Sequence, residues 1–172
     1  DAPTLAGMPT DITGTEDVAS NVNLSAVTLA DVDSSDADFT LSVAVGAGKL
    51  SASSGGGVTV SGSNSGSLLL TGTVASIDSF LNTASNIKYT GISNANGNDS
   101  TTLSLTANDQ DGSGNIQLGT AKIDITAVND APILYANALD GALSFDGSDD
   151  YASFAFDDSA LTTAFTLETW IR

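Results

Sequence analysis

Apolar and polar residues alternate in short runs along most of the chain. The longest run, Phe39 to Val45, alternates over seven residues, which is the pattern of a strand with one buried face. Shorter alternating runs lie at 58–60, 87–89, 103–105 and 123–125, and a short apolar run at 68–70 is also expected to form a strand. Glycine- and serine-rich stretches at 54–57 and 61–66 separate some of them and favour tight turns. The pattern predicts an all-β fold of about seven short strands, typical of a two-sheet sandwich.

One segment has the spacing of a helix. Residues 76–83 place Ile77, Phe80 and Leu81 on one face. Ser76 is the expected N-cap, and Asp78 would then lie in the first turn, where a negative charge is favourable. We therefore expect a single short helix within the β fold.

A short sequence motif occurs twice and divides the chain into two parts. Asp1-Ala-Pro-Thr-Leu5 returns 129 residues later as Asp130-Ala-Pro-Ile-Leu134, which indicates one unit of a tandem array covering residues 1–132. Residues 133–172 differ in composition, because seven of the ten aromatic residues follow Pro132. Alternating runs at 142–146 and 165–171 predict strands, but about 40 residues without a disulfide rarely form their own core. This segment is expected to be the start of a second domain.

Composition excludes several classes of function. The 172 residues include 21 acidic and 4 basic residues, with no Cys and no His, for a formal charge of −17. Disulfides, zinc ribbons, imidazole metal sites and a Ser-His-Asp triad are therefore absent. The charge disfavours nucleic acid and anionic membrane surfaces as partners. No apolar run reaches the roughly 18–20 residues that membrane insertion needs.

Aspartate dominates the acidic residues and gathers in clusters. There are 19 Asp and 2 Glu, and Asp favours turns over helices. The clusters Asp31-Val-Asp33-Ser-Ser-Asp36-Ala-Asp38 and Asp109-Gln-Asp111-Gly112 carry carboxylates at i and i+2, which can converge on Ca²⁺. An EF-hand is excluded, because its twelfth position would be Ser42 or Thr120. The alternative is that these Asp are solvated turn residues, which is the favoured interpretation for Asp36 and Asp38.

Several of these motifs together resemble a known family. They are Thr15-Glu16-Asp17, Asp31-Val-Asp33, Ala107-Asn-Asp109-Gln-Asp111-Gly112 and Val128-Asn-Asp-Ala-Pro132, together with the stretch from Ile77 to Asp111, which contains the expected short helix. The combination is similar to the cadherin-like repeats of large secreted, RTX-type adhesins of Gram-negative bacteria. The resemblance implies a cadherin-like or immunoglobulin-like β-sandwich over residues 1–132, with Ca²⁺ held at the junctions between neighbouring repeats. The RTX nonapeptide Gly-Gly-x-Gly-x-Asp itself does not occur in these residues.

The resemblance also implies metal ligands at particular positions. The junction at the C-terminal end would be lined by Glu16, Asp109, Asp111, Asn129 and Asp130. Asp31 and Asp33 would face the preceding junction, with Asp1 as the remnant of its linker. Cadherins have a further Asp where this chain has Ala127, so fewer ions per junction are expected.

The tail resembles a second family. Ala142-Leu-Ser-Phe-Asp-Gly-Ser-Asp-Asp-Tyr151 and Phe165-Thr-Leu-Glu-Thr-Trp-Ile171 look like the opening strands of a laminin-G-like, concanavalin-type jelly roll. Such domains often bind glycans, which implies a glycan ligand for the second domain. Only about a quarter of such a domain is present, so no sugar site is assigned within these residues.

These expectations combine into a non-enzymatic function. The chain is predicted to be a calcium-rigidified spacer repeat of a bacterial surface adhesin, extracellular and active in cell adhesion and biofilms. It would lead into a glycan-binding domain. The alternative is an accessory region of a secreted glycoside hydrolase, for which Glu168 would need a second carboxylate nearby. A purely structural surface-layer or filament subunit is a third possibility.

Overall fold

The computed structural model describes residues 1–33, 39–130, 133–134 and 143–144. The chain divides into two compact units, Asp1–Val128 and Asn129–Arg172. The division falls four residues before the predicted boundary after residue 132. The first unit is an all-β sandwich with one short helix, which confirms the predicted fold class.

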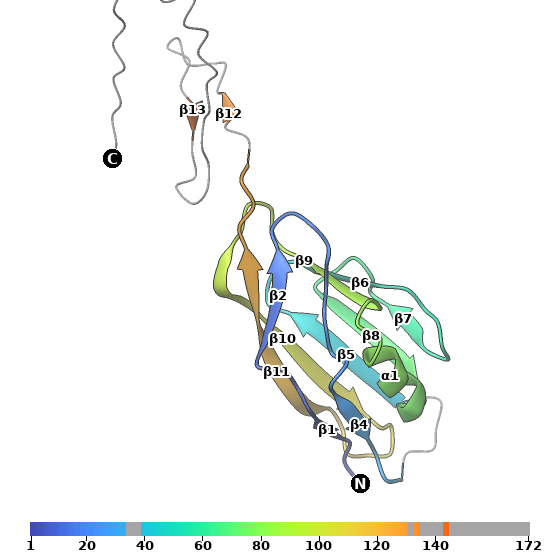
Figure 1. Ribbon diagram of the computed structural model, residues 1–172. Coiled ribbons are helices and arrows are strands. Elements are labelled where there is room, and N and C mark those ends of the chain that lie inside the picture. The colour runs from blue at the N-terminus through green and yellow to red at the C-terminus, as the bar shows by residue number, and fades with distance from the viewer. Residues whose placement is uncertain (34–38, 131–132, 135–142, 145–172) are drawn as a thin grey trace, which may run out of the picture. The chain divides into compact units, whose positions relative to one another are not determined.

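The larger layer of the first unit is a sheet of six strands (Figure 1). In spatial order these are β2 (Asp11–Thr15), β11 (Ile116–Thr126), β10 (Gly97–Asn108), β5 (Phe39–Val45), β8 (Ser67–Gly72) and β7 (Thr59–Ser61). All neighbouring pairs are antiparallel except β2 and β11, which run parallel. The predicted runs at 39–45, 68–70, 103–105 and 123–125 all lie within these strands, and the run at 58–60 overlaps β7.

Smaller elements complete the first unit. They are the three-stranded sheet β3 (Ser20–Asn21), β9 (Ile87–Thr90) and β6 (Lys49–Ala52), the pair β1 (Thr4–Ala6) and β4 (Thr28–Ala30), and the helix α1 (Val74–Leu81). In the second unit, β12 (Ile133–Leu134) pairs antiparallel with β13 (Leu143–Ser144).

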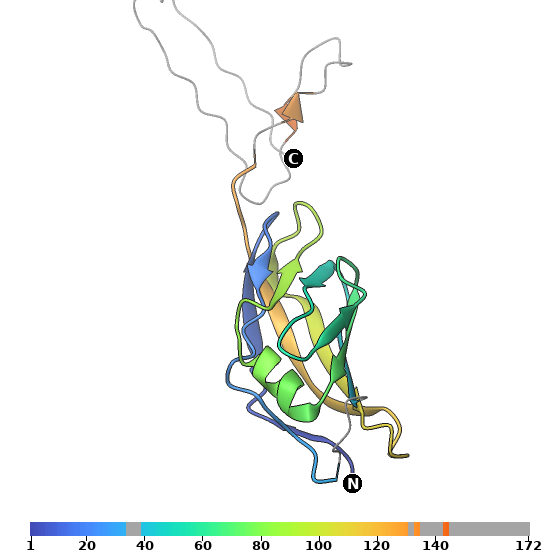
Figure 2. The same cartoon turned by 90° about the vertical axis from the view of Figure 1, so that its right-hand side faces the viewer.

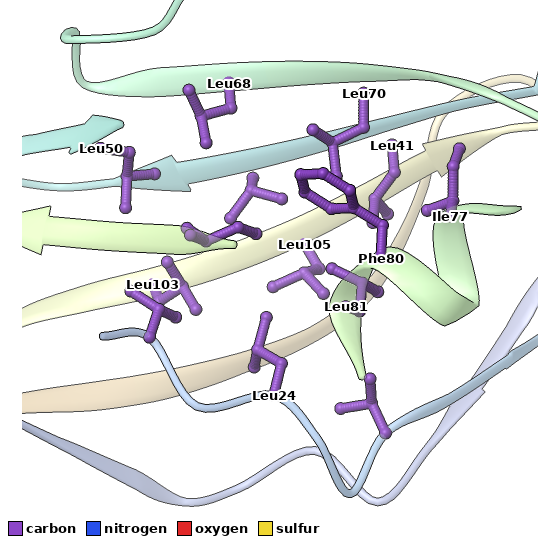
Figure 3. Packing of buried hydrophobic residues seen from close by; sticks show 14 of the residues in the cluster. Leu24, Leu41, Leu50, Leu68, Leu70, Ile77, Phe80, Leu81, Leu103 and Leu105 are labelled. Atoms are coloured by element: carbon purple, nitrogen blue, oxygen red, sulfur yellow. The ribbon is translucent and has the colours of Figure 1, made fainter. Parts of the chain in front are cut away.

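The core lies between the six-stranded sheet and the smaller elements, namely the helix and the strands β6 and β9, which contribute Leu50, Ile87 and Tyr89. Alternate residues of β5, namely Phe39, Leu41 and Val43, are fully buried. Figure 3 shows Leu41, Leu70 and Leu105 of the sheet gathered around the helix residues Ile77, Phe80 and Leu81. Each such side chain contributes about 1.5–3 kcal/mol when it is buried fully. The alternation predicted from the sequence therefore builds the core directly.

The helix begins two residues earlier than expected. Thr73, and not Ser76, is the N-cap, and its Oγ1 accepts a hydrogen bond from the Ser76 amide at 3.1 Å. Thr73 follows β8 directly and is still in an extended conformation, so its hydroxyl reaches the first turn as soon as the strand ends. Asp78 consequently lies beyond the first turn, in contrast to the prediction. The predicted apolar face of Ile77, Phe80 and Leu81 is buried.

Strand directions define two ends of the first unit, seen in Figure 1 and from the side in Figure 2. Thr15 of β2 pairs with Thr126 of β11, and Gly97 at the start of β10 pairs with Ile125. We call this end, where β2 and β11 finish, the C-terminal pole. At the opposite end Ala107 of β10 pairs with Ile116. We call that end, which also carries Asp1, the N-terminal pole.

Some sequence predictions fall outside the described residues. The runs 142–146 and 165–171 do so apart from residues 143–144, which form β13. Glu168, all seven tail aromatics, and Asp36 and Asp38 are likewise outside. Over the residues that are described, no helix is long and apolar enough to cross a membrane.

Candidate metal-binding poles

The N-terminal pole gathers acidic residues from two distant segments. Asp31 and Asp33 follow strand β4, and Asp109 follows strand β10. The amino group of Asp1 donates a hydrogen bond to the Asp33 carboxylate. The charges of Asp33, Asp31 and Asp109 all help to raise the pKa of this amine, so these groups lie within electrostatic reach of one another.

Asp109 and Asp111 were expected at the opposite end, and that placement is wrong. β10 runs antiparallel to β11, so the loop after β10 lies at the end of the sheet where β11 begins. Motif order along the chain does not reveal this reversal, because it depends on which strands pair. The predicted ligands Asp31, Asp33 and Asp109 are thus brought together at a single pole, with Asp111 two residues further along the same loop.

The Asp31 carboxylate is the unusual member of this group. Both of its oxygens are buried, and neither accepts a hydrogen bond. Burial is the main reason that the pKa of Asp31 is raised, and the neighbouring carboxylates of Asp33 and Asp109 raise it further. The nearby Asp33 amide offsets part of this rise. A buried acceptor without a donor costs about 1–3 kcal/mol, and more if it is charged. A cation beside these oxygens would remove that cost.

The neighbouring carboxylates are held in their charged form. The Ser113 hydroxyl donates to Asp109 Oδ2 and is the main reason that the pKa of Asp109 is lowered. The Asp111 amide also donates to Asp109 Oδ1 at 3.0 Å. The Asp1 amine likewise lowers the pKa of Asp33. This pole therefore offers ionised oxygen ligands, the type that a hard cation such as Ca²⁺ prefers.

The C-terminal pole is built around Glu16, which is 1% exposed. Its Oε1 accepts a hydrogen bond from Asn96 Nδ2 at 3.1 Å, and its Oε2 accepts from the Val128 amide at 2.9 Å. Both carboxylate oxygens thus have protein donors. Asn129 and Asp130, the other predicted ligands of this junction, are the first residues of the second unit.

A third acidic cluster lies on the six-stranded sheet, where no ligand had been predicted. Asp11 of β2, Asp99 of β10 and Asp124 of β11 present carboxylate oxygens within 4.8 Å of one another and could hold a metal ion. The Asp99 amide donates to Asp124 Oδ1 at 2.8 Å. These residues are scattered singly in the sequence, so only the strand pairing brings them together. No local spacing signal could have revealed the cluster.

Comparison with known proteins adds no assignment to this geometry. The sequence matches no protein-family model, and none of the curated proteins is significantly similar to it.

Proposed function

We propose that this chain is a calcium-stiffened spacer repeat of an extracellular bacterial adhesin, with neighbouring repeats of the same protein as its partners. The observation that carries the proposal is the Asp31 carboxylate, whose oxygens are buried without donors beside Asp33 and Asp109. An orphaned carboxylate among ionised carboxylates is the environment that a hard divalent cation completes. The adhesin assignment itself rests on the sequence motifs.

The proposed mechanism is electrostatic. Without a cation, the carboxylates at the N-terminal pole repel one another, and the loops that carry them are held less firmly. Ca²⁺ takes about six to eight oxygen ligands, which is more than three carboxylates readily supply. A preceding repeat would add oxygens from its own linker, as Asn129 directly before the second copy of the Asp-Ala-Pro motif suggests. The ion would then join two repeats and stiffen the array.

The remaining parts of the proposal derive from resemblance. Glu16, Asn129 and Asp130 as calcium ligands stay a prediction, as does a glycan ligand for the second domain. We propose no catalytic role for these residues. An accessory region of a secreted glycoside hydrolase remains the alternative, and it would require carboxylates paired across a substrate site in sequence beyond Glu168.

Thermal unfolding of the whole chain tests the metal proposal. When the free Ca²⁺ concentration is about 100 times the dissociation constant, specific binding stabilises the folded state by about 2.7 kcal/mol. We therefore expect a clear rise in the unfolding midpoint between EDTA and millimolar Ca²⁺, with little effect of Mg²⁺. The matched variants are Asp109→Asn at the N-terminal pole and Asp124→Asn in the cluster on the sheet.

The two variants separate the two candidate sites. Loss of the calcium effect in Asp109→Asn but not in Asp124→Asn supports the N-terminal pole. The reverse result moves the ion to the Asp11, Asp99 and Asp124 cluster. Equal and small shifts with Ca²⁺ and Mg²⁺ in every form of the protein would indicate charge screening and overturn the proposal.

A further inference from the structure

A side chain of the helix is bonded to the strand that leads into the N-terminal pole. Asp78 Oδ1 accepts a hydrogen bond from the Leu29 amide at 2.8 Å, which joins residues 49 positions apart. Its second oxygen, Oδ2, accepts from Asn82 Nδ2 at 3.1 Å, one turn further along α1. Each oxygen of the Asp78 carboxylate therefore has a donor, one from β4 and one from α1.

Strand β4 has few backbone hydrogen bonds to other strands. It contains three residues, and within the described part of the chain it pairs only with β1, another strand of three residues. A two-stranded ribbon of this length is marginal by itself in water. The Leu29 side chain is buried, and its amide bonds to Asp78 on α1. The contact with α1 thus anchors the strand.

The same strand delivers the proposed ligands. Asp31 lies two residues after Leu29, and Asp33 follows two residues later. A hollow of about 520 Å³ is lined by Asp31 and Asp78 together with apolar residues of β4 and of the first turn of α1. A displacement of β4 relative to the helix would therefore move the carboxylates of Asp31 and Asp33 away from Asp109.

We infer that Asp78 is a positioning residue for the cation site at the N-terminal pole. The inference rests on the proposed function, and it adds a residue that neither the sequence motifs nor the acidic clusters include. Asp78 acts through the Leu29 amide: it holds β4 so that Asp31 and Asp33 are already in place when the ion arrives. Groups that orient the ligands of a metal commonly change its affinity by about 10–100-fold when they are removed.

Calcium titration of the whole chain by calorimetry tests this role. Asp78→Ala removes the acceptor for Leu29, and we expect the dissociation constant for Ca²⁺ to rise by about 10-fold, at the lower end of such effects. Asp78→Asn loses the same charge but keeps an oxygen acceptor, so its affinity should stay within about 3-fold of the unaltered protein. Ser79→Ala, an exposed position on the same helix, is the matched control.

The outcomes are distinct. A purely structural role would lower the unfolding midpoint of Asp78→Ala in EDTA and leave its calcium affinity unchanged, which overturns the inference alone. Equal weakening in the Ala and Asn variants would assign the effect to charge and overturn it too. If the unaltered protein binds no Ca²⁺, the proposed function fails and the inference with it.

Asp78→Glu covers the case in which the alanine variant does not fold. It keeps the carboxylate and its charge but lengthens the side chain by one methylene, so it should displace β4. We expect a folded protein with weaker calcium binding, and an unchanged dissociation constant would overturn the inference.

Discussion

Glu16 at the C-terminal pole and Asp31 at the N-terminal pole have buried carboxylate oxygens that differ in their hydrogen bonding. At the C-terminal pole, Glu16 is buried and receives one hydrogen bond on each oxygen, from Asn96 and from the Val128 amide. At the N-terminal pole, the oxygens of Asp31 are buried and receive none. Asp109 at the N-terminal pole is also buried and has donors on both oxygens. The contrast is therefore between Glu16 and Asp31.

The contrast separates a structural carboxylate from a candidate ligand. A buried charge that is fully hydrogen-bonded stabilises the fold, because removing it would leave its donors without an acceptor. A buried charge without donors destabilises the fold until something outside the chain compensates it. Burial and negative charge alone therefore do not identify a cation site. The distribution of donors distinguishes them, and it makes Asp31 the strongest candidate ligand of the N-terminal pole.

The largest expected effect comes from Glu16. Glu16→Ala removes the buried acceptor that receives hydrogen bonds from Asn96 Nδ2 and the Val128 amide, so we expect a loss of about 3 kcal/mol in the free energy of unfolding. Glu16→Gln keeps one acceptor oxygen and should lose about half as much. Urea unfolding in EDTA measures both.

A calcium series provides the control for Glu16. The loss should be the same in EDTA and in Ca²⁺ if protein donors satisfy this carboxylate. If Glu16→Ala instead abolishes the calcium effect while scarcely changing the metal-free protein, then Glu16 is a cation ligand and the contrast between the poles disappears.

Asp31 should behave in the opposite way. Asp31→Asn removes a buried charge and its repulsion with Asp33 and Asp109, so the metal-free protein should gain about 1 kcal/mol. The same variant should lose most of the stabilisation by Ca²⁺. Destabilisation of the metal-free protein by Asp31→Asn would contradict the picture of an orphaned carboxylate.

The pH dependence sharpens this test. The pKa of Asp31 is raised in the folded protein, chiefly by burial, so folding is disfavoured at pH values where the group is ionised in the unfolded chain. Protonation relieves the penalty as the pH falls through the raised value. The advantage of Asp31→Asn over the unaltered protein should therefore be largest near neutral pH and shrink in acid. The lowered pKa of Asp109 acts in the opposite direction in both proteins. The pKa of Asp33 is lowered chiefly by the Asp1 amine and partly by Asp31, so only the second part changes in the variant.

The core of this fold could be predicted from the sequence, because alternation is a local property. The run from Phe39 to Val45 and the helix face of Ile77, Phe80 and Leu81 needed only the periods of strands and helices. The start of the helix was missed because two hydroxyl residues, Thr73 and Ser76, can both cap it. The end of the preceding strand decided between them.

The site was predictable only in part. The close spacing of Asp31 and Asp33, together with the family resemblance, predicted a cation ligand pair, and that assignment stays a prediction. The grouping with Asp109 depends on the antiparallel pairing of β10 and β11. The grouping of Asp11, Asp99 and Asp124 likewise depends on strand register. Alternation indicates that a segment is a strand, but it does not indicate its neighbour. Non-local geometry is therefore the part that sequence patterns leave open.

The smallest expected effect concerns the Asp1 amine, which donates to Asp33 in an exposed ion pair. The hydrogen bond to Asp33 raises the pKa of this amine above its ordinary 8.0, so its stabilising contribution is fully present below pH 8.0 and is lost as the pH rises through the raised value.

Acetylation of Asp1 removes the charge at every pH. We expect a slightly lower unfolding midpoint at pH 7, no difference above the raised value, and somewhat tighter calcium binding because the ammonium no longer competes for Asp33. The measurements are thermal unfolding across pH and a calcium titration of the acetylated chain. Weaker calcium binding after acetylation would mean that the amine orders Asp33 for the ion and does not compete with it.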